Sequence, residues 1–286
     1  MNHCKTIVNQ KGGVGKTTST VNLGVGLAQA GNRVLLVDDD PQHSLTISLG
    51  IRNADEDLDI TLATAMQAEI RDESVPWEKG IIHSGEGVDL LPANIELSGV
   101  EMSLFNAMSR EQVLKSVLSR VKENYDYILI DCMPSLGLMS INALVAADSV
   151  IIPSAPDFLS TKGLNLLIRT ISRVRRQINP KLKIDGILMT MVDGRTNNAK
   201  SIIAALRSTL GGRVRVFETE IPRSVRAAEA SGEGKSIFAF APKSQVAQAY
   251  TNLTKEVAEL GKETDALLPE TEHQGALQHL YRRVEH

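Results

Sequence analysis

The chain has 286 residues, 42% of them hydrophobic, and a formal net charge of −3, a composition that can bury the core of one α/β domain. No run of about 18 apolar residues could span a bilayer and the first five residues are too short and polar for a signal peptide, so we expect a cytoplasmic protein without stable membrane insertion. Its two cysteines, Cys4 and Cys132, lack metal-ligand spacing, which is typical of a reducing compartment.

The first predicted strand and helix enclose a glycine-rich loop. Residues 6–9 form a β-branched run typical of a buried strand, and residues 17–30 carry apolar side chains at helical spacing. Between them, QKGGVGKTT (residues 10–18) contains three glycines, which let backbone N–H groups approach a phosphate chain closely. The N-terminus of the following helix adds a positive dipole end. The loop predicts a nucleotide site; the alternative is a strand-to-helix turn without a ligand.

This loop carries two lysines, Lys11 and Lys16. It departs from the strict pattern G-x-x-x-x-G-K-[ST], because Gln10 stands where the first glycine belongs. One lysine suffices for an ordinary phosphate loop. The second lysine is a compact positive charge able to offset negative charge on phosphoryl oxygens, and its presence limits the classes of nucleotide-binding protein that fit the loop.

Carboxylates follow two predicted buried strands. The apolar run 34–37 ends in three consecutive aspartates (38–40), and the run 127–130 ends at Asp131. Ligands of open α/β sheets bind at the carboxyl ends of strands, so these groups are well placed for chemistry. A buried, unpaired Asp131 would be costly, which favours a metal or hydrogen-bond role. We expect the Asp39 side chain to point away from the site, and an ordinary loop carboxylate is the alternative for the first two aspartates.

The later sequence alternates strands and helices. Strands are expected at 149–153, 183–191 and 214–219, and helices at 162–177, 198–210 and 244–260. These units predict an α/β fold with a mainly parallel twisted sheet flanked by helices. The stretch 51–125 is less regular, with a strand at 88–91.

We expect one domain over residues 1–260, without a helix-turn-helix domain ahead of it, and a polar tail over 261–286. The tail begins as an acidic linker and ends in a segment that can form a short C-terminal helix with one apolar face, made of Leu277, Leu280, Tyr281 and Val284. That helix could bind a partner or a membrane surface, or pack as a simple chain end. It carries fewer bulky apolar residues and lysines than a membrane-targeting helix needs.

The charges are distributed unevenly along the chain. Residues 161–250 hold 16 Lys and Arg against 6 Asp and Glu. This excess predicts a basic face that could engage nucleic-acid phosphates in a salt-dependent way. A solvated charged surface is the alternative reading.

The stretch NQKGGVGKTT resembles the deviant Walker A motif of the ParA/MinD family of P-loop ATPases, closest to the ParA (Soj-like) partition proteins, and the resemblance covers nearly all of residues 1–260. It implies a P-loop NTPase fold with ATP and Mg²⁺ as cofactors. It further implies that Lys16 holds the β and γ phosphates, that Thr17 binds Mg²⁺, and that Lys11 reaches across a dimer to the partner's ATP. The implied nucleotide contacts are Lys11, Gly12, Gly13, Val14, Gly15, Lys16, Thr17, Thr18, Pro222 and Arg223.

Two further motifs, RVLLVDDDPQ and YDYILIDCMPSLGL, match the family pattern. By this resemblance Asp38 and Asp131 join Thr17 at the Mg²⁺ ion, and Asp40 positions the attacking water. The implied catalytic residues are Lys11, Lys16 and Asp40. Met133 replaces a proline that is common in the family.

The segments VDGRTN and IPRSVRAAEA resemble those whose arginines bind DNA in ParA proteins. Arg195 and Arg226 match residue by residue, while Arg223 also lies close to where the family holds adenine. The resemblance implies an ATPase that forms a homodimer in the ATP state, binds DNA without sequence preference and associates with the nucleoid. A ParB-like centromere-binding partner protein would stimulate hydrolysis to ADP and phosphate during plasmid or chromosome segregation.

Other classes remain as alternatives. A MinD-like ATPase of division-site placement would cycle on membranes, and vesicle binding without DNA binding would identify it. A nitrogenase-type iron–sulfur reductase would need two cluster cysteines per subunit, and a P-loop ligase such as a dethiobiotin synthetase would need a substrate pocket that the sequence does not reveal.

Overall fold

A computed structural model gives the structure of the chain and describes residues 2–210 and 214–266. In these residues eight strands form one sheet in the order β3-β4-β2-β5-β1-β6-β7-β8. Neighbouring strands pair in parallel, apart from the antiparallel pair β3 and β4 at one edge. The strands are β1 His3–Ile7, β2 Val34–Asp39, β3 Ile82–His83, β4 Asp89–Leu91, β5 Tyr127–Cys132, β6 Ser149–Ser154, β7 Lys183–Val192 and β8 Val216–Pro222.

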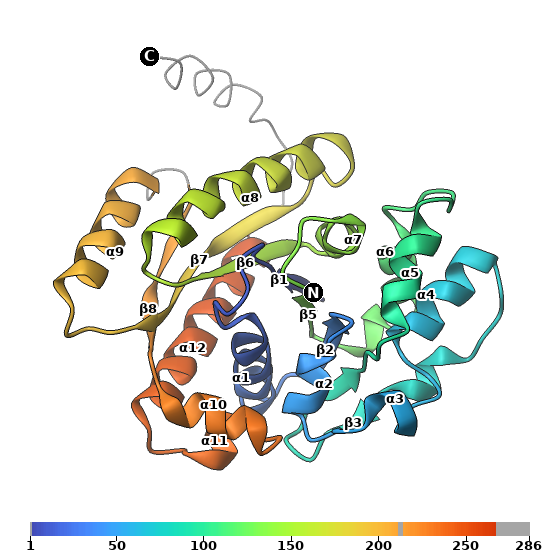
Figure 1. Cartoon of the computed structure of the whole chain (residues 1–286), viewed down its shortest axis with the longest axis horizontal. Helices are drawn as coiled ribbons and strands as arrows, with labels where there is room; N and C mark the ends of the chain where they lie inside the picture. Colours follow the sequence, from blue (N-terminus) through green and yellow to red (C-terminus); the bar gives the residue numbers. More distant parts are fainter. Residues whose placement is uncertain (1, 211–213, 267–286) are drawn as a thin grey trace.

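Helices cover both faces of this sheet (Figure 1). One face packs against α1 Lys16–Gln29, α2 Ser44–Ser48, α10 Val225–Gly232, α11 Ile237–Phe240 and α12 Gln245–Ala266. The other packs against α4 Leu62–Arg71, α5 Leu97–Leu104, α6 Val113–Ser119, α7 Leu138–Ala146, α8 Phe158–Gln177 and α9 Asn197–Leu210. Short turns of helix complete the description: α3 Ala54–Asp57, η1 Trp77–Gly80 and η2 Lys122–Asn124.

Strand β2 illustrates why the sheet is buried on both sides. Leu35 and Val37 belong to the core under α4 to α9, whereas Val34 and Leu36 belong to the core under α1 and α12. Successive side chains of a strand point to opposite faces, so a continuous apolar run suits a strand with two covered faces. The polar residues that end the strand are therefore held in a dry environment.

Helix α1 lies close against the sheet and against α12. A Cβ at Gly24 would lie 2.5 Å from Leu36 Cδ2, and a Cβ at Gly26 would collide with Thr254 Oγ1. The two glycines thus permit an approach that larger residues would prevent. This packing fixes the N-terminus of α1 beside the carboxyl ends of β1 and β5, where the glycine-rich loop begins.

The predicted fold class is confirmed, and the element boundaries differ in detail. The first strand ends at Ile7, two residues before the predicted end at Asn9, and the Asn9 side chain donates to the Pro153 carbonyl at 2.8 Å. The long terminal helix extends past residue 260 to Ala266, so the first residues of the predicted linker are helical.

The less regular stretch 51–125 contains the helices α3 to α6, the edge strand β3 and its neighbour β4. The apolar tail residues Leu277, Leu280, Tyr281 and Val284 lie outside the described residues. Among the helices of the described chain, none combines the length and the apolar character needed to cross a bilayer.

Candidate active site

The glycine-rich loop connects β1 to α1 and can surround an anion. Gly13 and Gly15 have φ values of 69° and 77°, in the left-handed region that favours glycine. The Val14 carbonyl accepts a hydrogen bond from Thr190 Oγ1 at 2.8 Å, which ties the loop to β7. Helix α1 starts at Lys16 without a side-chain cap, so its first N–H groups are available to a bound phosphate.

Lys16 points into this loop. Its side chain is buried, and its Nζ donates to the Lys11 carbonyl at 3.3 Å. Burial lowers the pKa of Lys16 from its usual value, and the nearby Asp131 carboxylate opposes this shift. A phosphate in the loop would give this ammonium group a stronger, charged acceptor.

Two carboxylates stand side by side where β2 and β5 pair. Asp38 and Asp131 are register partners and both are fully buried. Asp131 accepts hydrogen bonds from Thr17 Oγ1 at 2.6 Å and Thr20 Oγ1 at 3.1 Å. Asp38 Oδ2 accepts from the Thr46 N–H at 2.8 Å and from the Thr46 hydroxyl at 2.7 Å. Burial raises the pKa of Asp38 to about 8 and that of Asp131 to about 7.

These groups fit a Mg²⁺ ion. Asp38 Oδ1 is buried and has no hydrogen-bond partner among the described residues, so one carboxylate oxygen is left without compensation. Hydroxyl and carboxylate oxygens are the hard donors that Mg²⁺ prefers, with phosphate oxygens and waters completing the octahedron. The described chain contains no cluster of three or more His, Cys, Asp or Glu side chains with metal-site geometry. Thr17, Asp38 and Asp131 would hold the ion, which would supply positive charge at the phosphates.

The other two aspartates of the run 38–40, Asp39 and Asp40, have different surroundings. Asp40 follows β2, and its Oδ1 accepts the Gln42 N–H at 2.9 Å. Asp39 is fully buried, and neither carboxylate oxygen has a hydrogen-bond partner in the described residues. Burial, followed by the nearby Asp38, raises the pKa of Asp39 well above its usual value. Strand alternation turns Asp39 to the opposite face from Asp38, in agreement with the sequence-based expectation.

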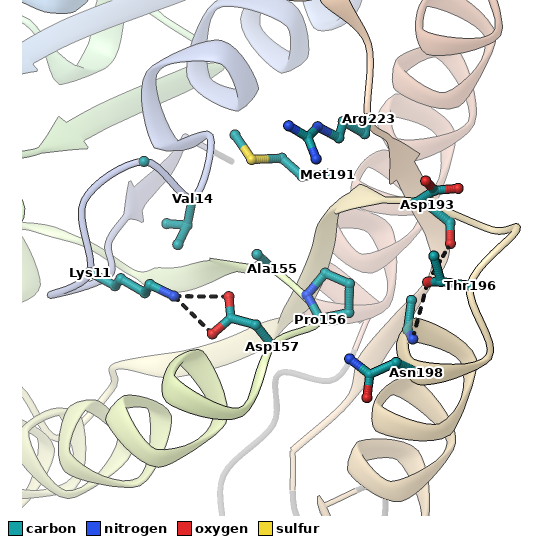
Figure 2. A pocket seen from close by; sticks show the side chains of 12 residues that line it. Lys11, Val14, Ala155, Pro156, Asp157, Met191, Asp193, Thr196, Asn198 and Arg223 are labelled. Carbon is teal, nitrogen blue, oxygen red and sulfur yellow. Dashed lines mark hydrogen bonds and ion pairs between the residues drawn. The ribbon is translucent and has the colours of Figure 1, made fainter.

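Lys11 lies at the rim of the loop, and its side chain points toward Asp157. Its Nζ is 2.8 Å from both carboxylate oxygens of Asp157, just before α8 (Figure 2). Both residues line a cavity of about 380 Å³. Val14, Met191, Asp193 and Arg223 also face this cavity, so it lies between the loop and the ends of β6 and β7.

The predicted base contacts and DNA-binding arginines occupy the neighbouring surface. Pro222 ends β8 and Arg223 follows it, and both line, together with Arg226, a second cavity of about 580 Å³. Arg195 lies in the loop between β7 and α9, where Nε and Nη2 each donate to Asp193 at 2.9 Å. The structure thus groups Arg223 with Arg226 and places Arg195 in a separate loop.

Three hydrogen-bond or ion-pair partners of the site residues were not predicted from the sequence. Thr20 and Thr46 hydrogen-bond the buried carboxylates, and Asp157 pairs with Lys11. Thr20 could have been found, because it lies three residues after Thr17 on the same helix face. Nothing in the sequence marks Thr46 or Asp157, whose contacts depend on the tertiary fold.

Comparison with known proteins supports the same class of site. The family model described as an AAA domain matches residues 3–184. The sporulation initiation inhibitor protein Soj of Bacillus subtilis (strain 168) is 46% identical over 257 residues, which cover 89% of this chain and 98% of the relative. The chromosome partitioning protein ParA of Caulobacter vibrioides is 40% identical over 253 residues, covering 88% of this chain and 92% of the relative.

Among solved structures, the cobyrinic acid a,c-diamide synthase of Mycobacterium smegmatis with bound ATP analog and magnesium has a TM-score of 0.80. It is 33% identical and covers 92% of this chain and 97% of that chain. Its bound ligands agree with the prediction of ATP and Mg²⁺ as cofactors.

A phosphate loop between a strand and a helix, with carboxylates at the ends of neighbouring parallel strands, defines a P-loop nucleotide-binding protein. The chain belongs to the ParA/MinD family of P-loop ATPases and is close to the ParA (Soj-like) partition proteins.

Proposed function

We propose that the chain is a partition ATPase that dimerises around ATP and binds DNA without sequence preference in the ATP state. It hydrolyses ATP to ADP and phosphate when a ParB-like centromere-binding partner stimulates it, and it thereby segregates a plasmid or chromosome in the cytoplasm, on the nucleoid. The similarity to chromosome partitioning proteins supports this proposal.

The observation that carries the proposal is the divergence of the two loop lysines. Lys16 is buried and directed into its own loop, whereas Lys11 of the same loop is partly exposed and directed to Asp157. An ammonium group at the rim can exchange Asp157 for a phosphate that another subunit brings, and a group directed inward cannot. ATP and Mg²⁺ at Thr17, Asp38 and Asp131 complete the proposed centre.

The proposed DNA interface consists of Arg195, Arg223 and Arg226. Arg195 is 90% exposed, so it can reach a phosphate backbone without rearrangement of the core. Contacts between arginines and backbone phosphates do not distinguish DNA sequences, and they weaken as the salt concentration rises.

DNA retention measured with ATP, with ADP and without nucleotide across a salt series tests the proposal. Retention that requires ATP and falls with salt is the expected result. Anionic vesicles in place of DNA provide the second arm, because ATP-dependent vesicle binding without DNA retention would identify the MinD-like alternative. A brown protein with an iron–sulfur absorbance band would identify the reductase alternative, although both cysteines are buried and burial raises the pKa of Cys4 to about 12.

A further inference from the structure

Lys11 is engaged within its own subunit. Its Nζ contacts both oxygens of Asp157 at 2.8 Å, and the two side chains are 37% and 42% exposed. The pair closes one side of the cavity between the loop and the end of β6 (Figure 2). An ammonium group held by this carboxylate cannot at the same time bond fully to a phosphate of another subunit.

The backbone around Lys11 is fastened to the same part of the fold. Asn9 Nδ2 donates to the Pro153 carbonyl at 2.8 Å, and Asn9 Oδ1 accepts the Lys11 N–H at 3.0 Å. Gln10 Nε2 donates to the Gly163 carbonyl in α8 at 3.0 Å. These bonds fix the Lys11 backbone from two directions. A change of partner therefore requires only rotation of the flexible lysine side chain, not movement of the loop.

From these contacts we propose that Asp157 is the positioning residue for Lys11. Its carboxylate holds the ammonium group inside the subunit until a second subunit presents a nucleoside triphosphate. Asp157 and the triphosphate compete for the same Nζ. The inference rests on the proposed function, because it requires that Lys11 acts across a dimer.

The solvent exposure of the Lys11–Asp157 pair determines how strongly the pair should affect dimerisation. A surface ion pair of this kind shifts an equilibrium by about 1.4- to 5-fold. A symmetric dimer releases two such pairs, so the dissociation constant should change by about 2- to 30-fold. The Lys11–Asp157 contact is weak enough for a multiply charged phosphate to displace it. It is strong enough to disfavour dimerisation of the free subunits.

Asp157→Asn tests the inference, with dimerisation measured by analytical ultracentrifugation in the presence of Mg²⁺ and a slowly hydrolysed ATP analogue. The variant should dimerise about 2- to 30-fold more tightly than the unsubstituted chain, and the difference should shrink at high salt. Glu78→Gln is the matched control. It removes the Arg120–Glu78 pair, which has similar exposure, 39% and 34%, and is not part of the nucleotide site. It should leave dimerisation unchanged.

A double-mutant cycle of Lys11 and Asp157 distinguishes positioning of the lysine from a purely structural role of Asp157. In a Lys11→Ala background, Asp157→Asn should not restore dimerisation, because the expected gain requires the released lysine; recovery of dimerisation in the double variant would overturn the inference, since Asp157 would then oppose the dimer independently of Lys11. Asp157→Glu, which keeps the charge, should restore behaviour close to that of the unsubstituted chain. Asp157→Ser provides a second neutral side chain if the asparagine variant does not fold.

Unchanged or weaker dimerisation of both neutral variants, in a chain whose dimerisation depends on Lys11, would overturn the inference alone. Dimerisation that does not require Lys11 would overturn the proposed function and this inference together. The two failures are therefore distinguishable by the Lys11→Ala measurement.

Discussion

Replacement of Asp39 by valine should stabilise the nucleotide-free protein. Asp39 is fully buried at the end of β2, and neither carboxylate oxygen has a hydrogen-bond partner in the described chain. Valine has a similar volume and suits a strand packed on both faces. The substitution removes an uncompensated polar group without leaving a cavity.

The expected gain follows from the burial. An unsatisfied buried polar group costs about 1–3 kcal/mol, so the free energy of unfolding should rise by that amount. For a domain of this size each kcal/mol raises the melting temperature by about 2–4 °C, which gives about 2–12 °C in total. The gain should be largest at high pH, where Asp39 is ionised in the unfolded chain and the buried carboxyl group must either keep its proton or carry an unpaired charge.

The sign of the pH dependence follows from the direction of the pKa shift. Burial raises the pKa of Asp39 in the folded protein above the value of about 3.9 in an unfolded chain. The folded state then binds more protons, so stability falls as pH rises from about 4 through the raised pKa. Asp38 and Asp131, with folded pKa values of about 8 and about 7, act in the same direction. Asp126 and Asp193, with pKa values of about 2, are ionised in both states above pH 5 and do not contribute.

Urea unfolding between pH 5 and pH 8, in EDTA and without nucleotide, measures both effects. The unsubstituted chain should lose stability with rising pH, at up to about 1.4 kcal/mol per pH unit for each titrating group. Asp39→Val should reduce this slope, and Asp39→Asn should reduce it equally while keeping a polar side chain. A stability that rises with pH over this range, or a valine variant that is less stable at pH 8, would refute the reasoning.

Three further predictions concern the site and its support. Lys11→Ala should abolish ATP-dependent dimerisation and hydrolysis, whereas Asp40→Ala should keep the dimer and trap it with ATP; size-exclusion chromatography and phosphate release distinguish them, and equal loss of dimerisation would contradict this division. Arg195→Glu and Arg226→Glu should weaken DNA retention at low salt and leave dimerisation intact, so unchanged retention would remove these arginines from the interface. Gly26→Ala should cost about 1–3 kcal/mol in thermal unfolding, because its methyl group collides with Thr254 Oγ1 between α1 and α12.

Local patterns were sufficient to predict the parts of the site that follow one another in the chain. The glycine-rich loop and Asp131 are each determined by a strand and the residues directly after it, so the sequence predicts their place at the carboxyl end of the sheet. The contacts between Asp38 and Thr46, and between Lys11 and Asp157, join different elements. Such contacts depend on how helices pack against the sheet, which hydrophobic periodicity does not specify. The same reason explains why the short helices of 51–125 were not predicted.

The charge balance of the site links its two lysines to each other. Asp38 and Asp131 are fully buried, with the Lys16 ammonium group near Asp131, and the raised pKa values of both carboxyl groups reflect how poorly this environment supports negative charge. A triphosphate adds further negative charge to the same place, so its binding requires additional cations. Mg²⁺ can supply part of that charge within the subunit. Lys11 is held by Asp157 in each free subunit, and we propose that the Lys11 of a second subunit leaves its Asp157 to supply the remainder. In the proposed mechanism this balance makes dimerisation favourable only when ATP is bound, and Asp157 then determines how readily the dimer forms.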